Sequence, residues 1–177
     1  MNPYQYVKDA VKEDDTVLSL CAGIGLELFE VECKEITAVD IHQPHLDKLS
    51  ETYPQVKTVC SDILSYLKKQ KDNSFDVVSL IDGIEHLTKK DGLEALREAV
   101  RVCKREMLVF TPKGFVKNEP HNAWGIEGGD KYQTHKSGWE PEELAEFGFE
   151  ILSQGPNHSQ HGDLIQEMIY RLEKPSV

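Results

Sequence analysis

Two glycines separated by one residue lie at a predicted strand-to-helix turn near the start of the chain. Residues 16–20 (TVLSL) form a short apolar run, and residues 21–25 (CAGIG) follow it directly. Glycine lets a ligand approach the backbone closely, and the N–H groups at the start of a helix bind polar groups. The dinucleotide fingerprint needs a third glycine three positions after the second, where this chain has Leu28. The turn therefore predicts a ligand-binding loop whose ligand is not a dinucleotide pyrophosphate.

Aspartates follow three later apolar segments. Asp40 ends ITAVD, Asp62 follows the next segment, and Asp82 follows FDVVSLI. If these segments are parallel strands, their carboxyl ends meet at the edge where doubly wound sheets bind ligands. Asp40 could then accept hydrogen bonds from the hydroxyls of a ribose, and Asp62 could accept one from the exocyclic amine of adenine. The alternative is that each aspartate only caps the helix that follows it.

Isoleucines stand directly after two of these acidic residues. Ile41 follows Asp40, and Ile63 follows Asp62. Both could hold a base by apolar contact, or both could simply belong to the core. We expect them to contact the base.

Residues that could move a proton occur in the stretch DGIEH. On a helical turn, Asp82, Glu85 and His86 would share one face, because they are spaced at i, i+3 and i+4. Such a set could form a carboxylate-assisted base or a magnesium site. His135 is a second candidate, either as a base or acceptor contact or as a residue that only fixes its own loop. We expect Glu85, His86 and His135 to be catalytic, and we predict no metal at this site or at the His-rich stretch 157–163.

Strand and helix patterns alternate along the chain and would position these residues. Predicted helices cover residues 3–12, 25–32, 44–53, 63–69, 91–103 and 141–147. Predicted strands cover residues 16–20, 35–40, 56–60, 75–81, 106–111, 149–153 and 164–172. This order predicts a single α/β domain over residues 1–177: a doubly wound, seven-stranded, mostly parallel sheet with an antiparallel last strand.

One long segment has little periodicity. Between the ends of the segment 112–139 lie three aromatic residues (Phe115, Trp124 and Tyr132), two histidines and several glycines. Loops of this length in compact domains are usually functional or disordered, and the aromatic content argues against disorder. We predict that this segment is a lid over an acceptor site.

The overall charge and length exclude several classes of partner. The chain has 177 residues and a net charge of −11, from 20 basic and 31 acidic residues, and no basic stripe interrupts the acidic surface. Such a surface repels phosphate backbones, so nucleic acid is not an expected partner. No apolar run approaches the roughly 20 residues of a membrane span, and no signal peptide is recognisable, so we expect a cytoplasmic protein that does not bind membranes. The oligomeric state stays open.

Taken together, these motifs resemble the class I S-adenosylmethionine-dependent methyltransferases. The shared features are the strand–GxG–helix unit, the acidic end of the second strand, SDIL after the third, and FDVVSLIDGIEHL at the fourth. Residues 132–152 (YQTHKSGWEPEELAEFGFEIL) resemble a stretch of the small type 11/12 members. The resemblance covers the chain from about Thr16 to Leu172.

The resemblance implies a cofactor, S-adenosylmethionine, and a set of residues that bind it. These residues are Ser19, Cys21, Ala22, Gly23, Gly25, Asp40, Ile41, Asp62, Ile63 and Asp82. The family usually has an acidic residue where Ser19 stands and a glycine where Cys21 stands. Ser19 carries no charge to meet an ammonium group, and Cys21 suggests that its position does not need a positive φ. Tyr4 and Tyr6 could help to cover the cofactor.

The predicted function is methyl transfer from S-adenosylmethionine to a small-molecule acceptor, at oxygen or nitrogen. One alternative is a non-catalytic regulatory protein that binds S-adenosylmethionine or a nucleotide, which the departures at Ser19 and Cys21 would allow. A less favoured alternative is an NAD-dependent dehydrogenase, which uses the same sheet and the same Asp40 but needs the glycine that Leu28 replaces.

Overall fold

A computed structural model describes residues 2–119, 122, 124–158 and 164–175. One seven-stranded sheet forms its centre, in the spatial order β3-β2-β1-β4-β5-β7-β6. The strands are β1 (Thr16–Leu20), β2 (Glu35–Asp40), β3 (Lys57–Cys60), β4 (Phe75–Ile81), β5 (Cys103–Pro112), β6 (Glu150–His158) and β7 (Leu164–Glu173). β7 is antiparallel to both of its neighbours, β5 and β6, and the other pairs of neighbouring strands are parallel. The predicted fold class is therefore confirmed.

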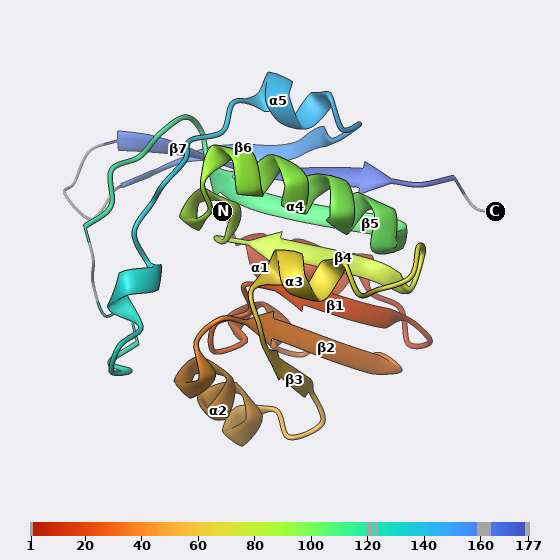
Figure 1. Ribbon diagram of the computed structural model, residues 1–177. Coiled ribbons are helices and arrows are strands. Elements are labelled where there is room, and N and C mark those ends of the chain that lie inside the picture. Colours follow the sequence, from red (N-terminus) through yellow and green to blue (C-terminus); the bar gives the residue numbers. More distant parts are fainter. Residues whose placement is uncertain (1, 120–121, 123, 159–163, 176–177) are drawn as a thin grey trace.

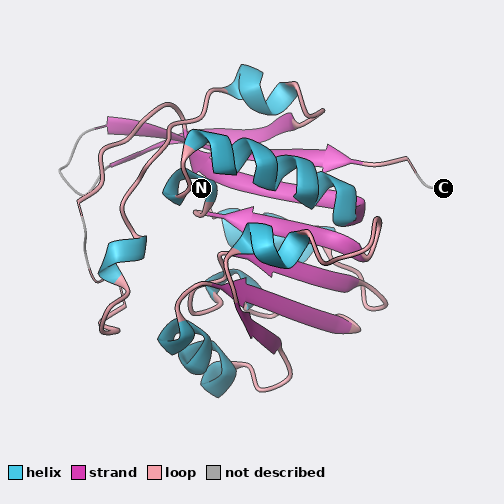
Figure 2. Cartoon of the chain, in the orientation of Figure 1, coloured by secondary structure: helices cyan, strands magenta, loops and turns pink. Residues whose placement is uncertain are grey.

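Helices cover both faces of the sheet (Figures 1 and 2). They are α1 (Pro3–Ala10), α2 (Gln43–Thr52), α3 (Ile63–Leu67), α4 (Lys89–Val102) and α5 (Pro141–Ala145). Three single 3-10 turns join them: η1 (Leu26–Leu28), η2 (Ile84–His86) and η3 (Asp130–Tyr132). The core against α3 and α4 contains alternate strand residues such as Leu18 and Val78, whereas Val17 and Val77 face α2 on the other side. This alternation is what a sheet covered on both faces requires.

Helix α4 starts two residues earlier than its apolar pattern predicted. The Thr88 side chain accepts a hydrogen bond from the backbone N–H of Asp91, which satisfies one of the free donors at the helix start. Gly92 of this helix lies against Trp139, where an added Cβ would be 2.5 Å from the indole Cζ2. This contact holds Trp139 against the core. The stretch between β5 and Trp139 is called segment 113–138 below.

The helix predicted over residues 25–32 is wrong, because only the turn η1 forms there. Gly25 begins the turn with φ 80°, and Glu30 ends the segment at φ 54°. The Glu27 side chain is turned into the protein instead of lying on an exposed helix face, and only 5% of the residue is exposed. Within the described residues, no helix has both the length and the apolar character needed to cross a membrane.

The chain order of the strands reverses between β1 and β4. β1, β2 and β3 extend to one side, and β4 then returns to the opposite side of β1. Both pairs are parallel, so the loops that follow these strands diverge from one edge and leave a crevice there.

Candidate functional site

Two adjoining cavities lie at the carboxyl ends of the central strands. The smaller has a volume of about 120 Å³ and the larger about 340 Å³. Cys21, Asp82 and His86 belong to the walls of both. The crevice predicted from the strand order therefore contains two compartments that meet at the ends of β1 and β4.

The smaller cavity brings together most of the residues predicted to bind the cofactor. Its walls include Cys21, Gly23, Asp40, Ile41, Asp62, Ile63 and Asp82. Ile41 is 48% exposed, so its side chain is not part of the core. Asp62 also caps α3, because its Oδ1 accepts a hydrogen bond of 2.8 Å from the backbone N–H of Ser65. Hydrogen bonds from Ser65 lower the pKa of Asp62, which keeps this carboxylate ionised.

Asp40 fixes the glycine loop to the end of β2. Its Oδ2 accepts a 2.9 Å hydrogen bond from the N–H of Gly23, and its Oδ1 accepts a 2.8 Å bond from the N–H of His42. An ionised carboxylate has about four lone-pair positions, so both oxygens can still accept hydroxyl groups. The geometry suits a carboxylate that holds the loop and a ribose at once.

The backbone at Cys21 differs from the expectation. Its φ is 55°, so the inference that this position does not need a positive φ is wrong. A non-glycine residue in this region is strained. Gly83 makes room for the side chain, since a Cβ added there would be 2.8 Å from the Cβ of Cys21. The loop has no glycine at residue 21, and the glycine at residue 83 leaves the space that the Cys21 side chain occupies.

The two glycines of the loop have different surroundings. A Cβ on Gly23 would be 2.7 Å from the indole Cη2 of Trp124, so the bare backbone there is in contact with the ring. A Cβ on Gly25 would be 2.9 Å from Cγ of Leu49, in the helix α2. Gly25 therefore lies against α2. Neither Gly25 nor the fully buried Ser19 contributes to the walls of either cavity.

Side chains of segment 113–138 cover the smaller cavity. Trp124 and Tyr132 line it, and Trp124 contacts His45 edge to face with 4.8 Å between ring centroids. The ring of Tyr132 is tilted against that of His42, with 5.5 Å between the ring centroids. In Figure 1 the segment crosses from the upper part of the sheet toward the end of α2. Its role as a movable lid stays a prediction.

The larger cavity is lined by four carboxylates. Glu27 lies in η1, Asp82 directly after β4, Glu85 in η2 and Glu167 in β7, and all four border the cavity. Asp82 has φ 48°, and its backbone N–H is bonded to the carbonyl of Phe110. Asp82 is exposed at the cavity, but the surrounding protein partly desolvates its carboxyl group, and this effect, together with the negative charges of Glu85, Glu167 and Glu27, raises the pKa of Asp82 well above its ordinary value. Tyr4 of α1 lines the same cavity, whereas Tyr6 does not.

Glu27 is a residue that the sequence analysis missed. Its Oε1 accepts a 2.6 Å hydrogen bond from the hydroxyl of Ser79, and the hydroxyl of Ser19 also lies beside the carboxyl group. The Ser19 hydroxyl makes no hydrogen bond of regular geometry within the described residues. Burial raises the pKa of Glu27 to about 7, and the two hydroxyls partly oppose this. The only sequence signal was the position of Glu27 between two leucines in the stretch LELFEV.

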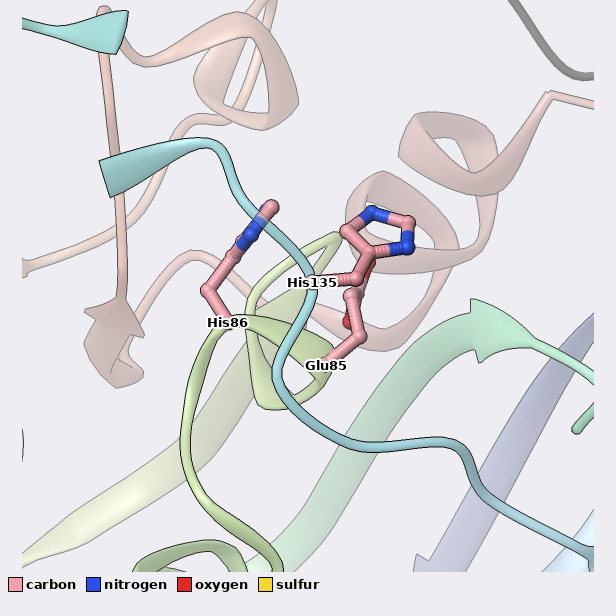
Figure 3. A group of neighbouring side chains, drawn as sticks. All are labelled: Glu85, His86 and His135. Carbon is pink, nitrogen blue, oxygen red and sulfur yellow. The ribbon is translucent and has the colours of Figure 1, made fainter. Parts of the chain in front are cut away.

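The three predicted catalytic residues lie together at the larger cavity (Figure 3). One potential ligand atom from each of Glu85, His86 and His135 lies within 4.8 Å of the others, and the two imidazole centroids are 5.0 Å apart. His135 reaches this place from segment 113–138, whereas the other two belong to η2. The spacing of Asp82, Glu85 and His86 alone did not reveal this grouping.

Neighbouring groups orient each of the three side chains. Glu85 Oε2 accepts a 3.0 Å hydrogen bond from the hydroxyl of Thr111. Nδ1 of His135 is 2.7 Å from the carbonyl oxygen of Val116, and Nδ1 of His86 is 3.3 Å from that of Thr134. Donation from Nδ1 to a carbonyl leaves Nε2 as the basic nitrogen in the neutral ring. The group can therefore accept a proton, and it also has the chemistry of a divalent-metal site.

Burial raises the pKa of Glu85 to about 7, with hydrogen bonds from Thr111 and from backbone N–H groups opposing the shift. A carboxyl group with such a pKa is suited to general acid–base chemistry near neutrality. Of the His-rich stretch 157–163, residues 159–163 lie outside the described residues.

Comparisons with known proteins agree with this geometry. Residues 18–111, more than half of the chain, match the family model described as a methyltransferase domain. No curated protein matches the chain. The similar solved structures include 1,6-didemethyltoxoflavin-N1-methyltransferase of Burkholderia thailandensis with bound S-adenosylhomocysteine, at 16% identity, with a TM-score of 0.66 and coverage of 97% of this chain and 77% of that one.

Two further solved structures show how widely the fold is used. The N-methyltransferase NodS of Bradyrhizobium japonicum, in complex with S-adenosylhomocysteine, has a TM-score of 0.65 at 11% identity, with 95% of this chain and 83% of that chain covered. The (4+2)-cyclase SpnF has a TM-score of 0.70 at 16% identity, with 98% and 80% covered. At these identities the likeness shows a shared fold.

The fold is thus an α/β fold with a doubly wound sheet, and its crevice lies at the switch point of that sheet. The chain belongs to the methyltransferase domain family, and its resemblance to the class I S-adenosylmethionine-dependent methyltransferases is confirmed.

Proposed function

We propose that this protein transfers a methyl group from S-adenosylmethionine to a small-molecule acceptor, at nitrogen or oxygen. The observation that carries the proposal is the pair of adjoining cavities. One is bordered by the residues expected to hold an adenosyl group, and the other is bordered by acid–base groups. Both S-adenosylhomocysteine-bound neighbours are named N-methyltransferases, which supports the same assignment.

The residues of the smaller cavity fit the cofactor. Asp40 can accept the ribose hydroxyls, while Ile41 and Ile63 offer apolar contacts to the base. The left-handed backbone at Gly23 leaves a surface free of side chain that Trp124 now contacts. We expect the indole to turn aside when the methionine portion binds.

The bound cofactor would supply an activated methyl group on a sulfonium. The protein must then hold the acceptor atom about 3–3.5 Å from that carbon and exclude water. Glu85, His86 and His135 are placed to take a proton from an acceptor that must lose one. The two cavities meet at Cys21, Asp82 and His86, and we place the transfer there.

A non-catalytic binding protein is the second candidate, favoured by Ser19 and by the strain at Cys21. The convergence of Glu85, His86 and His135 on an open cavity argues for an enzyme, because a buried carboxyl group such as that of Glu85 is otherwise destabilising. The (4+2)-cyclase neighbour shows that this fold alone does not decide the chemistry. A dehydrogenase is disfavoured by Leu28 and by the family match.

Calorimetric titration tests the proposal. We expect S-adenosylmethionine and S-adenosylhomocysteine to bind at micromolar concentrations and NAD not to bind. Replacing Asp40 by Asn should weaken cofactor binding by about tenfold or more, because the buried carboxylate holds both the loop and the ribose. The matched control is Asp47→Asn, since Asp47 is an exposed residue of α2. Failure of the cofactor to bind below millimolar concentration would refute the proposed function.

A further inference from the structure

The larger cavity has more acidic side chains in its walls than lysines and arginines. Glu27, Asp82, Glu85 and Glu167 line it, and Lys117 is the only lysine or arginine among the lining residues. Lys117 itself is paired with Glu119, at 2.5 Å. All lysines and arginines of the chain lie in its described part, and none forms an ion pair with any of the four carboxylates.

Two of these carboxylates are almost fully enclosed. Glu27 is 5% exposed and Glu85 is 3% exposed. Their hydrogen-bond donors are neutral, since Ser79 bonds to Glu27 and Thr111 to Glu85. Glu167 likewise accepts a 2.6 Å bond from the amide of Asn157. Burying a carboxylate with neutral donors alone is unfavourable, because desolvation of the charge is only partly compensated. The arrangement is stabilised once a cation enters.

The cofactor does not account for all of this charge. S-adenosylmethionine has a single sulfonium charge beside its amino acid group, whereas four carboxylates face the cavity. Glu167 and Ile165, on β7, belong to the larger cavity and not to the smaller one. They therefore lie on the side of the crevice away from the expected adenosyl site. A volume of about 340 Å³ suits a compact organic molecule.

We propose that the acceptor is a small organic amine, which enters the larger cavity as an ammonium ion facing Asp82, Glu85 and Glu167. This inference rests on the proposed function and specifies the substrate class of the same site. Apolar wall residues such as Ile81, Val116 and Ile165 would contact the carbon skeleton of the amine. An alcohol of the same shape gains no charge interaction here, so nitrogen is favoured over oxygen as the methylated atom.

The ammonium group must lose one proton before nitrogen can attack. Glu85 or an imidazole of the His86–His135 pair accepts that proton. The nitrogen lone pair then forms the N–C bond to the methyl carbon as the C–S bond breaks, and the electron pair of the broken bond stays on sulfur as a thioether. The product is a methylated ammonium ion, so the positive charge of the sulfonium passes to the acceptor and no further reactant is needed.

Binding to the protein saturated with S-adenosylhomocysteine tests the substrate class. The probes are matched pairs, phenethylamine with phenethyl alcohol and benzylamine with benzyl alcohol, titrated in the presence of EDTA. We expect the amines to bind at least about tenfold more tightly than the alcohols. The variant Glu167→Gln should remove most of this preference, whereas Glu173→Gln, on the exposed end of β7, should retain it.

The outcomes separate the two proposals. If S-adenosylhomocysteine does not bind, the proposed function fails. If it binds but amines and alcohols bind equally, or no amine gives saturable binding, the amine assignment is overturned and the methyl transfer proposal stands. If the preference appears only when EDTA is replaced by magnesium or zinc, the carboxylates serve a metal ion, which also overturns the assignment. If the Glu167→Gln variant still prefers amines to alcohols, the amine assignment is also overturned.

Discussion

At the scale of single residues, one buried acidic side chain comes from a different position in the sequence than the family resemblance implies. The family resemblance implies an acidic residue at 19, where this chain has Ser19. The carboxyl group of Glu27 reaches the hydroxyls of Ser19 and Ser79 from the turn η1. The carboxyl group missing from β1 is thus supplied by Glu27 in the turn that follows it. Pattern comparison at residue 19 could not show this, because the replacement depends on how η1 folds back.

Glu27 should lower the stability of the protein above neutral pH. Its pKa is about 7 in the folded state and 4.5 in the ordinary state, so the unfolded chain loses this proton first as the pH rises. The free energy of unfolding should therefore decrease as the pH rises from 4.5 to about 7, and it should level off above pH 7. Glu27→Gln removes this effect, on the order of 3 kcal/mol at most, and should be more stable than the wild type at alkaline pH.

Urea unfolding of the cofactor-free protein at acidic and alkaline pH measures the difference. The wild type and Glu27→Gln should converge near the ordinary pKa of glutamate. The control is Glu32→Gln, at an exposed position after the same turn. Its free energy of unfolding should change between acidic and alkaline pH as that of the wild type does. A Glu27→Gln variant less stable than the wild type at alkaline pH would contradict the burial argument.

Cys21 and Gly83 should be coupled. An alanine at residue 83 places its Cβ 2.8 Å from the Cβ of Cys21, so Gly83→Ala should destabilise the protein by about 1–3 kcal/mol. In a Cys21→Gly background the penalty should be smaller, since the opposing atom is gone. Denaturant unfolding of the four proteins in a double-mutant cycle gives the coupling energy. Additive effects would show that the penalty comes from another contact, such as Cδ1 of Leu80, which would also lie 2.8 Å from the added Cβ.

At the scale of elements, the central strands were predictable because they are nearly continuous apolar runs, and α4 was predictable from its helical period. The aspartates at or just after the ends of β2, β3 and β4 meet at one edge of the sheet. The helix that was predicted wrongly lies where a polar side chain is buried by hydrogen bonds rather than by apolar packing. The run 25–32 has helical spacing, yet Glu27 is drawn inward to two hydroxyls, and only η1 forms.

Segment 113–138 was also only partly predictable from the sequence. Its lack of periodicity identified it as a loop, but not which residues enter the crevice. Trp124 and His135 both enter, and Trp124 contacts Gly23 while His135 joins Glu85 and His86. Glu167 was missed because an acidic residue in a strand beside apolar neighbours is also the pattern of an exposed face.

Cofactor binding should displace Trp124. The chain has two tryptophans, and Trp139 is fully buried in the core with its indole N–H bonded to Ser137. A change in tryptophan fluorescence on adding S-adenosylhomocysteine should therefore come from Trp124. The change should vanish in Trp124→Phe and persist in Trp139→Phe, if that variant folds. An unchanged signal in Trp124→Phe would show that the ring does not respond to the ligand.

At the scale of the whole molecule, the net charge of −11 adds a long-range field to the local carboxylates. The field attracts cations and repels anions, and dissolved salt screens it over roughly 10 Å at 0.1 M. The two forms of the cofactor differ in net charge by one unit, because S-adenosylmethionine has a sulfonium and S-adenosylhomocysteine has a neutral thioether. They therefore form a matched pair of nearly equal shape for measuring this field.

Association of S-adenosylmethionine should be faster at low salt than at high salt, by roughly threefold or more, whereas S-adenosylhomocysteine should show a smaller effect. Stopped-flow measurement of the Trp124 fluorescence change gives both rates in the same protein. The surface variants Glu51→Gln and Glu146→Gln lie on exposed faces of the chain, and together they should reduce the salt dependence for S-adenosylmethionine without changing its dissociation rate. Equal salt dependence for the two ligands would mean that local contacts, rather than the acidic surface as a whole, set the rate at which the positively charged cofactor arrives.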